Sequence, residues 1–134
     1  MKTETENLIK ATMQGFAEAW RAGDVDKVMK LWDLQNPEMT YVPVDNNELI
    51  RDPKALKAYF DSELNGFTVT SAEMLEPVIR MVNDEYAYGF CLYQWAFESA
   101  TVTGTLRSRA TCLLRKQGQR WYYLHMHESV EVKG

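Results

Sequence analysis

The first third of the chain repeats its apolar residues at the spacing of an α-helix. One stripe consists of Ile9, Met13, Phe16 and Trp20. Thr3 and Glu6 fit a capping box that would open this helix. Gly23 suits the left-handed residue that stops a helix, and Asp24 suits the cap of the next one. The second stripe consists of Val25, Val28, Met29 and Trp32, and it ends at Asn36-Pro37. The pattern predicts a helical hairpin with a very short turn.

A third helix is predicted after a short strand. The strand covers residues 39–42 and runs into Pro43. Asp52 and Pro53 then form a cap followed by a first-position proline, which is typical of a helix start. The buried stripe of this helix consists of Leu56, Tyr59, Phe60 and Leu64.

After Asn65-Gly66 the apolar residues change to the alternating period of β-strands. Long strands are predicted at residues 67–82, 85–99, 102–116 and 120–131. Asn83-Asp84 and Gly118 mark turns between them. Pro77 cannot donate a hydrogen bond to a neighbouring strand, so it indicates an edge position or a bulge.

The strand predicted at 85–99 is apolar or aromatic on both faces. One face carries Tyr86, Tyr88, Phe90 and Leu92, and the other carries Cys91, Tyr93, Trp95 and Phe97. A strand of this kind needs cover on both sides. The helices supply one cover, and a second subunit is the economical candidate for the other.

The last strand has two faces of different chemistry. Strict alternation places Trp121, Tyr123, His125, His127 and Ser129 on one face, and Tyr122, Leu124, Met126 and Glu128 on the other. The first face is aromatic and titratable, and the second is apolar and ends in a carboxylate. A β-bulge near Pro77 or Gly104 would invert local parity and exchange the residue sets that line each face.

Three segments carry a family resemblance: residues 19–28 (AWRAGDVDKV), 49–60 (LIRDPKALKAYF), and 109–111 leading into 121–129 (WYYLHMHES). Their order and spacing resemble the nuclear transport factor 2-like superfamily, and within it the SnoaL-like and ketosteroid-isomerase-like group. The ending is also similar to the association domain of calcium/calmodulin-dependent kinase II. The resemblance implies an α+β fold, with three N-terminal helices packed on a strongly curved antiparallel sheet (a cystatin-like cone). It also implies an enclosed pocket and a homodimer.

The chemical positions of a ketosteroid isomerase are not filled in this chain. The resemblance aligns the isomerase Asp base with Val42-Pro43 and its oxyanion-binding Tyr with Phe16. The partner Asp of that site falls near Ala110 to Cys112. Steroid isomerisation is therefore not expected.

If the same alternate residues of each strand face inward as in the family, the resemblance implies a mostly apolar pocket for a small organic ligand. The pocket residues expected on this basis are Trp20, Trp32, Tyr41, Tyr59, Tyr93, Trp95, Cys112 and Met126. The alternative is that these aromatic residues simply fill the core. The resemblance also implies that Tyr41 and Asp45 lie near the pocket entrance, although Asp45 in Asp-Asn-Asn also fits a plain turn former.

Glu128 is the candidate catalytic group. On the apolar face burial would raise its pKa, which suits a general acid or base. If Arg107 or Arg109 reached it, the pKa would fall and the role would be structural; near the strand end it could also be solvated. Tyr41, Tyr59 and Tyr93 are candidates to polarise a carbonyl group.

A second polar set is expected on the opposite sheet face. It consists of Arg107, Arg109, Trp121, Tyr123, His125 and His127, and forms either a dimer face or an alternative polar site. The paired arginines could clamp a carboxylate. His125 and His127 could form two legs of a metal site, but the chain has no other His to complete it, and no metal is predicted.

Composition narrows the class of protein. At 134 residues the chain fits one domain, residues 1–134. The formal net charge of −4 and the scattered Lys and Arg disfavour a nucleic-acid surface. Cys91 and Cys112 lie in apolar strand patterns and are expected to be reduced and structural. No signal peptide or membrane-length apolar run is found, which predicts a cytoplasmic protein.

The sequence thus predicts a SnoaL-like dimeric protein whose specific activity is unassigned. If it is an enzyme, the family implies isomerase-, cyclase- or hydratase-type proton transfer without a cofactor. The alternative is a non-catalytic binding or oligomerisation module.

Overall fold

The structure is a computed structural model, and it describes residues 2–45 and 48–130. The helices are α1 (Lys2–Ala22), α2 (Val25–Met29) and α3 (Pro53–Gly66). The strands are β1 (Thr40–Val42), β2 (Thr68–Met81), β3 (Tyr86–Glu98), β4 (Thr103–Gln117) and β5 (Arg120–Val130). The predicted order of elements is confirmed.

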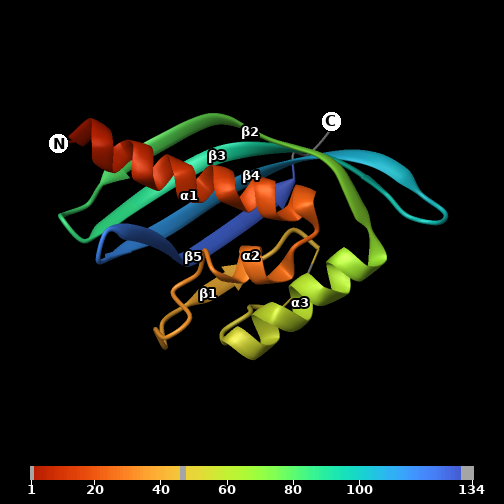
Figure 1. Ribbon diagram of the computed structural model, residues 1–134, viewed down its shortest axis with the longest axis horizontal. Coiled ribbons are helices and arrows are strands. Elements are labelled where there is room, and N and C mark those ends of the chain that lie inside the picture. The colour runs from red at the N-terminus through yellow and green to blue at the C-terminus, as the bar shows by residue number, and fades with distance from the viewer. Residues whose placement is uncertain (1, 46–47, 131–134) are drawn as a thin grey trace.

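The sheet has the order β1-β5-β4-β3-β2. The four long strands pair antiparallel, as predicted, whereas β1 pairs parallel to β5 and makes the sheet mixed. The helices gather on one face of the open sheet (Figure 1). The α+β class is therefore correct, and no helix formed by residues 2–45 or 48–130 lies over the other sheet face.

The helix starts and stops follow local chemistry in most places. Gly23 has a φ of 66°, and the Asp24 carboxylate accepts a hydrogen bond from the Lys27 amide at 3.1 Å, as a helix cap does. Asp52 caps α3 in the same way, accepting from the Ala55 amide at 2.8 Å. The predicted capping box at Thr3 is wrong, because α1 begins at Lys2 and Thr3 lies inside the helix.

The second helix is shorter than predicted. It ends at Met29 rather than at Asn36-Pro37. The Tyr123 amide donates to the Leu31 carbonyl at 2.8 Å, and the Asp33 amide donates to the Tyr123 carbonyl at 2.9 Å. Residues after α2 thus hydrogen bond to β5, and these long-range bonds replace the helical ones.

Three register shifts shape the sheet within the described residues, and the first lies between Val69 and Ser71 of β2. In β2 the register with β3 shifts between Leu75 and Val78, and Glu76 takes a φ of 51°. Because β2 is also an edge strand, both predictions drawn from Pro77 are confirmed. In β5 the register with β4 shifts as well: Leu113 pairs with His125 and Leu114 pairs with Tyr123, so Leu124 is the extra residue.

The bulge at Leu124 corrects the predicted faces of β5. Trp121 and Tyr123 are 3% and 0% exposed and face the core with Met126 and Glu128. His127 is exposed on the other face. The prediction that Trp121 and Tyr123 share a face with the two histidines is wrong, because the extra residue inverts the alternation in mid-strand.

The core lies between α1 and the sheet. The Phe16 ring packs against those of Tyr93 and Tyr123, with centroids 5.5 and 5.9 Å apart. The Tyr93 hydroxyl donates to the Met13 carbonyl at 2.5 Å, which fixes α1 on the sheet. Burying each such side chain stabilises the fold by about 1.5–3 kcal/mol.

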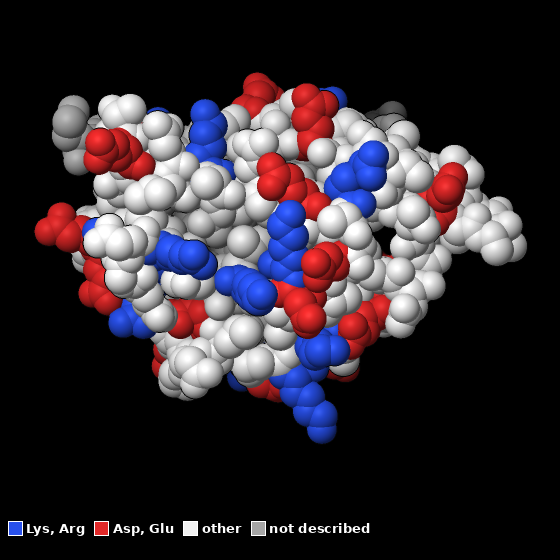
Figure 2. Space-filling model, in the orientation of Figure 1, with Lys and Arg blue, Asp and Glu red and all other residues white. Residues whose placement is uncertain are grey.

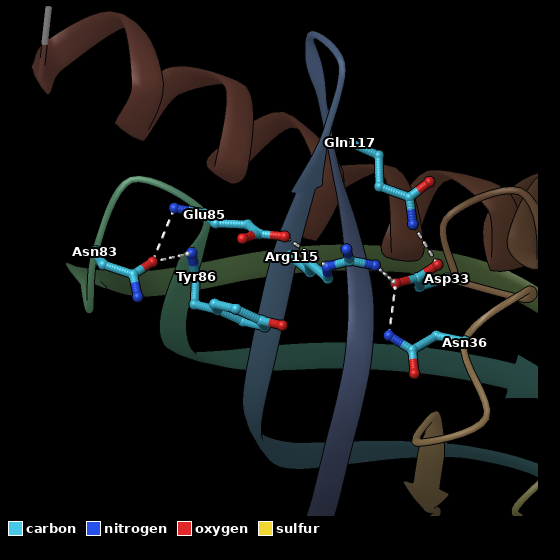
Figure 3. Close-up of polar contacts among 7 residues, drawn as sticks. All are labelled: Asp33, Asn36, Asn83, Glu85, Tyr86, Arg115 and Gln117. Atoms are coloured by element: carbon cyan, nitrogen blue, oxygen red, sulfur yellow. Dashed lines mark hydrogen bonds and ion pairs between the residues drawn. The ribbon is translucent and has the colours of Figure 1, made fainter.

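A network of polar side chains lies at the end of the sheet near the β4–β5 turn (Figure 3). Asp33 is buried, and its carboxylate accepts from Asn36, Gln117 and Arg115. The Arg115 guanidinium also contacts Glu85 at 3.0 Å. A buried carboxylate needs such partners, and here Arg115 and Gln117 tie the segment after α2 to β4, while Glu85 links Arg115 to the β2–β3 turn.

The surface does not concentrate positive charge on the face shown in Figure 2, where Lys and Arg alternate with Asp and Glu. Cys91 and Cys112 are buried and free of disulfides. Burial raises the pKa of the Cys91 thiol to about 12, which keeps it protonated. No helix within the described residues is long and apolar enough to cross a membrane.

Candidate active site

A cavity of about 220 Å³ opens between α1, α3 and the concave face of the sheet. Its lining residues are Phe16, Trp20, Tyr41, Val44, Asp45, Tyr59, Glu63, Phe67, Val69, Trp95, Phe97, Leu106 and Glu128. Aromatic side chains form most of the wall. The polar groups are carboxyls and phenols at two places: Glu128 with Tyr41, and Asp45 with Tyr59 and Glu63.

Glu128 lies at the buried end of the cavity and is 6% exposed. The Tyr41 hydroxyl donates to its Oε1. The Ser108 hydroxyl donates to its Oε2 at 3.2 Å, and the Trp95 indole donates to the Ser108 oxygen at 3.0 Å. The parallel pairing of β1 with β5, which sets Tyr41 beside Met126, brings the phenol to the carboxylate.

The pKa of Glu128 is raised to about 7. Burial is the main cause, hydrogen bonds from Tyr41 and Ser108 oppose it in part, and the charge of Asp45 adds to it. Burial and the neighbouring Glu128 charge raise the pKa of Tyr41 well above its ordinary value, so the phenol stays a hydrogen-bond donor. A carboxyl with this pKa populates both protonation states at neutral pH, as a general acid–base group must.

The arginines that could have neutralised Glu128 face away from it. Arg107 Nε donates to the Gln94 side chain at 3.0 Å, and Arg109 Nε donates to the Ser129 hydroxyl at 3.1 Å. Both are exposed on the convex face. The alternative in which an arginine lowers the pKa of Glu128 is therefore wrong.

A second carboxyl group stands at the cavity mouth. The Tyr59 hydroxyl donates to Asp45 Oδ1 at 2.6 Å. Burial, then hydrogen bonding with Asp45 and its charge, raise the pKa of Glu63 to about 8. Burial alone would raise the pKa of Asp45, but hydrogen bonds from Glu63 and Tyr59 lower it overall. At neutral pH this pair holds one proton between two carboxyls.

The structure divides the predicted pocket residues into two groups. Trp20, Tyr41, Tyr59 and Trp95 line the cavity, together with Glu128. Trp32, Tyr93, Cys112 and Met126 are buried in the core beside it and do not line it. Tyr93 is held by the Met13 carbonyl, and Cys112 lies against the Gly89 carbonyl at 3.6 Å, so α1 seals that part of the cone.

Sequence reasoning missed several residues that matter to the site. Glu63 lies one turn after Tyr59 on α3, so helical spacing alone could have placed it at the cavity. Ser108 shares the inward parity of Ala110 and Cys112, which was the available signal for the partner of Glu128. The other lining residues that were not anticipated are Phe16, Val44, Phe67, Val69, Phe97 and Leu106.

The alternative polar site is split by the fold. Arg107, Arg109 and His127 are exposed on the convex face, while Trp121 and Tyr123 lie in the core. His125 Nδ1 is 2.7 Å from the Thr40 hydroxyl. Burial and the nearby His127 lower the pKa of His125. In the part of the chain that the structure describes, no three metal-binding side chains come together.

Comparison with known proteins agrees with the fold. The sequence model of the SnoaL-like domain matches residues 9–133. No curated protein matches the chain significantly.

Several solved structures resemble this chain over nearly their whole length, although their sequence identity to it is low. A ketosteroid isomerase-like protein from Erwinia carotovora atroseptica has a TM-score of 0.78 at 13% identity, covering 95% of this chain and 96% of that one. A proposed dehydratase of the NTF2-like (nuclear transport factor 2-like) family from Streptomyces avermitilis has a TM-score of 0.83 at 14% identity, covering 99% and 100%. A proposed calcium/calmodulin-dependent protein kinase II association domain from Xanthomonas campestris has a TM-score of 0.79 at 18% identity, covering 94% and 87%.

Proposed function

The chain belongs to the SnoaL-like domain family, and on that basis we propose that it is an enzyme that moves a proton on a small, mostly apolar substrate without a cofactor. One observation carries the proposal. A buried carboxyl group, Glu128, lies at the end of an aromatic cavity with a pKa of about 7. Perturbed carboxyls in a cleft of this kind are typical of acid–base sites.

The arrangement supports reactions at a carbon next to a carbonyl group. Glu128 takes a proton from that carbon and returns it elsewhere on the substrate, which gives isomerisation, or to a departing hydroxyl, which gives dehydration. Two of the similar structures are named as a ketosteroid isomerase-like protein and a proposed dehydratase, and both names fit proton transfer of this kind.

In this proposal Tyr41 and Ser108 position the Glu128 carboxylate. Both hydroxyls donate to the carboxylate, so they orient it and keep its pKa from rising further. Once Glu128 takes the substrate proton, the Tyr41 hydroxyl is free to donate to the substrate oxygen on which charge develops. Tyr93 is given no role, because its hydroxyl is bound to the Met13 carbonyl outside the cavity.

The proposed enzyme is a homodimer in the cytoplasm. The convex face of the sheet carries Tyr88, which is 48% exposed, beside Phe90 and Leu92. None of the helices in the described part of the chain covers that face (Figure 1). A second copy would bury it, together with Arg107 and His127.

The test does not require the natural substrate. Small aromatic ketones are incubated with the protein in deuterium oxide, and exchange at the carbon next to the carbonyl is followed by NMR. We expect Glu128→Gln to slow exchange by about 10²-fold or more, because loss of a general base has that effect. Glu73→Gln, which removes an exposed carboxyl from β2, should leave exchange unchanged.

Exchange that is equally fast in Glu128→Gln would contradict the assignment. If the wild-type protein binds these ketones in the cavity but exchanges none of them, the non-catalytic binding module is the better description. The resemblance to a proposed kinase association domain favours that second function.

A further inference from the structure

The cavity has an unusual balance of charge. Its ionisable side chains are Tyr41, Asp45, Tyr59, Glu63 and Glu128, so each is an acid or a phenol. No Lys, Arg or His is found among the described residues that line it. A ligand that carries a carboxylate or a phosphate would meet only like charge there, which disfavours anionic substrates.

The walls of the cavity suit a cation as well as an apolar body. Phe16, Trp20 and Trp95 form a cluster whose ring centroids are 6.0–6.2 Å apart. Tyr59 and Phe97 extend the aromatic lining on other sides. The faces of aromatic rings attract cations, and cages of such rings with carboxylates nearby are how proteins bind ammonium groups.

The mouth supplies the carboxylates. Asp45 is exposed and Glu63 is half-buried, whereas Glu128 is buried, so the first two lie toward solvent and the third lies inside. Among the described residues no ion pair involves Asp45 or Glu63. They hydrogen bond to each other and to Tyr59, so two carboxyls meet at the mouth.

We propose that the substrate carries a protonated amine on a ring-containing body, with the ammonium group bound by Asp45 and Glu63 at the mouth. Its ring then lies against Trp20 and Trp95, and its reacting carbon points toward Glu128. This inference rests on the proposed function, because it assigns the substrate class of the same cavity. It adds a recognition site, separate from the proton-transfer group, that selects cations over neutral and anionic molecules of equal shape.

Isothermal titration calorimetry with three probes tests the charge preference. The probes are 2-phenylethylamine, 2-phenylethanol and phenylacetate, which share a ring and differ in charge. We expect the amine to bind about tenfold or more tightly than the alcohol, and phenylacetate to bind more weakly than either. The Asp45→Asn/Glu63→Gln double variant should bind the amine no better than the alcohol, with the alcohol affinity unchanged.

Asp61→Asn is the matched control. Asp61 lies on the same helix as Glu63, but its carboxylate pairs with Lys57 at 2.8 Å and does not line the cavity. The variant should keep the full amine preference. Equal affinity for amine and alcohol in the wild-type protein, binding of none of the probes, or an amine preference that survives in the double variant would each overturn the proposal.

The outcomes separate this proposal from the proposed function. Glu128→Gln should keep the amine preference while it loses carbon–hydrogen exchange. If Glu128→Gln keeps exchange and the amine preference depends on Asp45 and Glu63, the proton-transfer assignment fails and the amine site stands.

Discussion

Glu128 is buried, and the partners that the described residues give it are hydroxyl donors rather than cations, so its ionisation destabilises the fold. Burial raises its pKa from the ordinary value of 4.5 to about 7. Between these pH values the folded protein holds a proton that the unfolded chain has released. Stability from this group is therefore fully present below about pH 4.5 and is lost as the pH rises through about 7. The total change is about 3 kcal/mol.

Glu128→Gln should remove this pH dependence, because the amide does not ionise. The variant's free energy of unfolding minus that of the wild type should rise by about 3 kcal/mol as the pH increases from roughly 4 to roughly 8. Urea unfolding at both pH values measures it. Glu63 titrates in both proteins, so its contribution cancels in the difference. Glu73→Gln, at an exposed position, should show no such change, and a pH-independent offset for Glu128→Gln would refute the prediction.

The sequence predicted the chemistry of Glu128 better than its surroundings. Its place on an apolar strand face was enough to predict a raised pKa, because burial acts on any carboxyl there. Tyr41 was also among the predicted polar groups. Asp45 was expected near the entrance, but its pairing with Glu63 was not predicted, because Asp45 follows β1, Glu63 lies on α3, and only the packing of α3 over the sheet brings them together.

The bulge in β5 decides which residues of that strand reach the cavity. Alternation runs without a break from Trp121 to Ser129, and no Gly or Pro marks the extra residue. Sequence parity therefore placed Leu124 on the inner face and Tyr123 on the outer one. The pairing of Leu114 with Tyr123 and of Leu113 with His125 shows that both Tyr123 and Met126 point inward.

Two single-residue deletions test this assignment. Deleting Leu124 keeps every cross-strand pair of β5 and loses mainly one buried side chain, so we expect a cost of about 2 kcal/mol. Deleting His127 shifts the alternation of side chains by one residue. Either His125 then points inward and Met126 outward, or Glu128 points out of the cavity. That deletion should cost about 4 kcal/mol or more. Urea unfolding of both variants measures the difference, and equal costs would mean that Leu124 is not the bulge.

At the scale of the whole molecule, the order of elements could be predicted, but the long-range packing that leaves a cavity over the sheet could not. Apolar period and turn residues such as Gly23 and Asp52 identified the helices and long strands because those signals are local. The early end of α2 depends on backbone bonds to Tyr123, and the parallel pairing of β1 depends on β5. Which aromatics fill the core, as Tyr93 does, and which line a cavity, as Trp95 does, depends on how far α1 covers the sheet.

The uncovered convex face makes a prediction about assembly. Phe90 lies near the middle of that face, paired with Val78 and Thr111 on its two neighbours. If two copies pair through it, Phe90→Glu places like charges and unpaired carboxylates in the contact and should weaken the dimer about tenfold or more. Leu8→Glu adds the same charge at an exposed position of α1, whose buried side packs on the concave face, and should leave the dimer intact.

Sedimentation velocity over a range of concentrations should show the wild type and Leu8→Glu at twice the 15.5 kDa chain mass, with Phe90→Glu dissociating on dilution. A wild-type monomer at every concentration, or equal dissociation of both variants, would show that the convex face is not the contact between subunits.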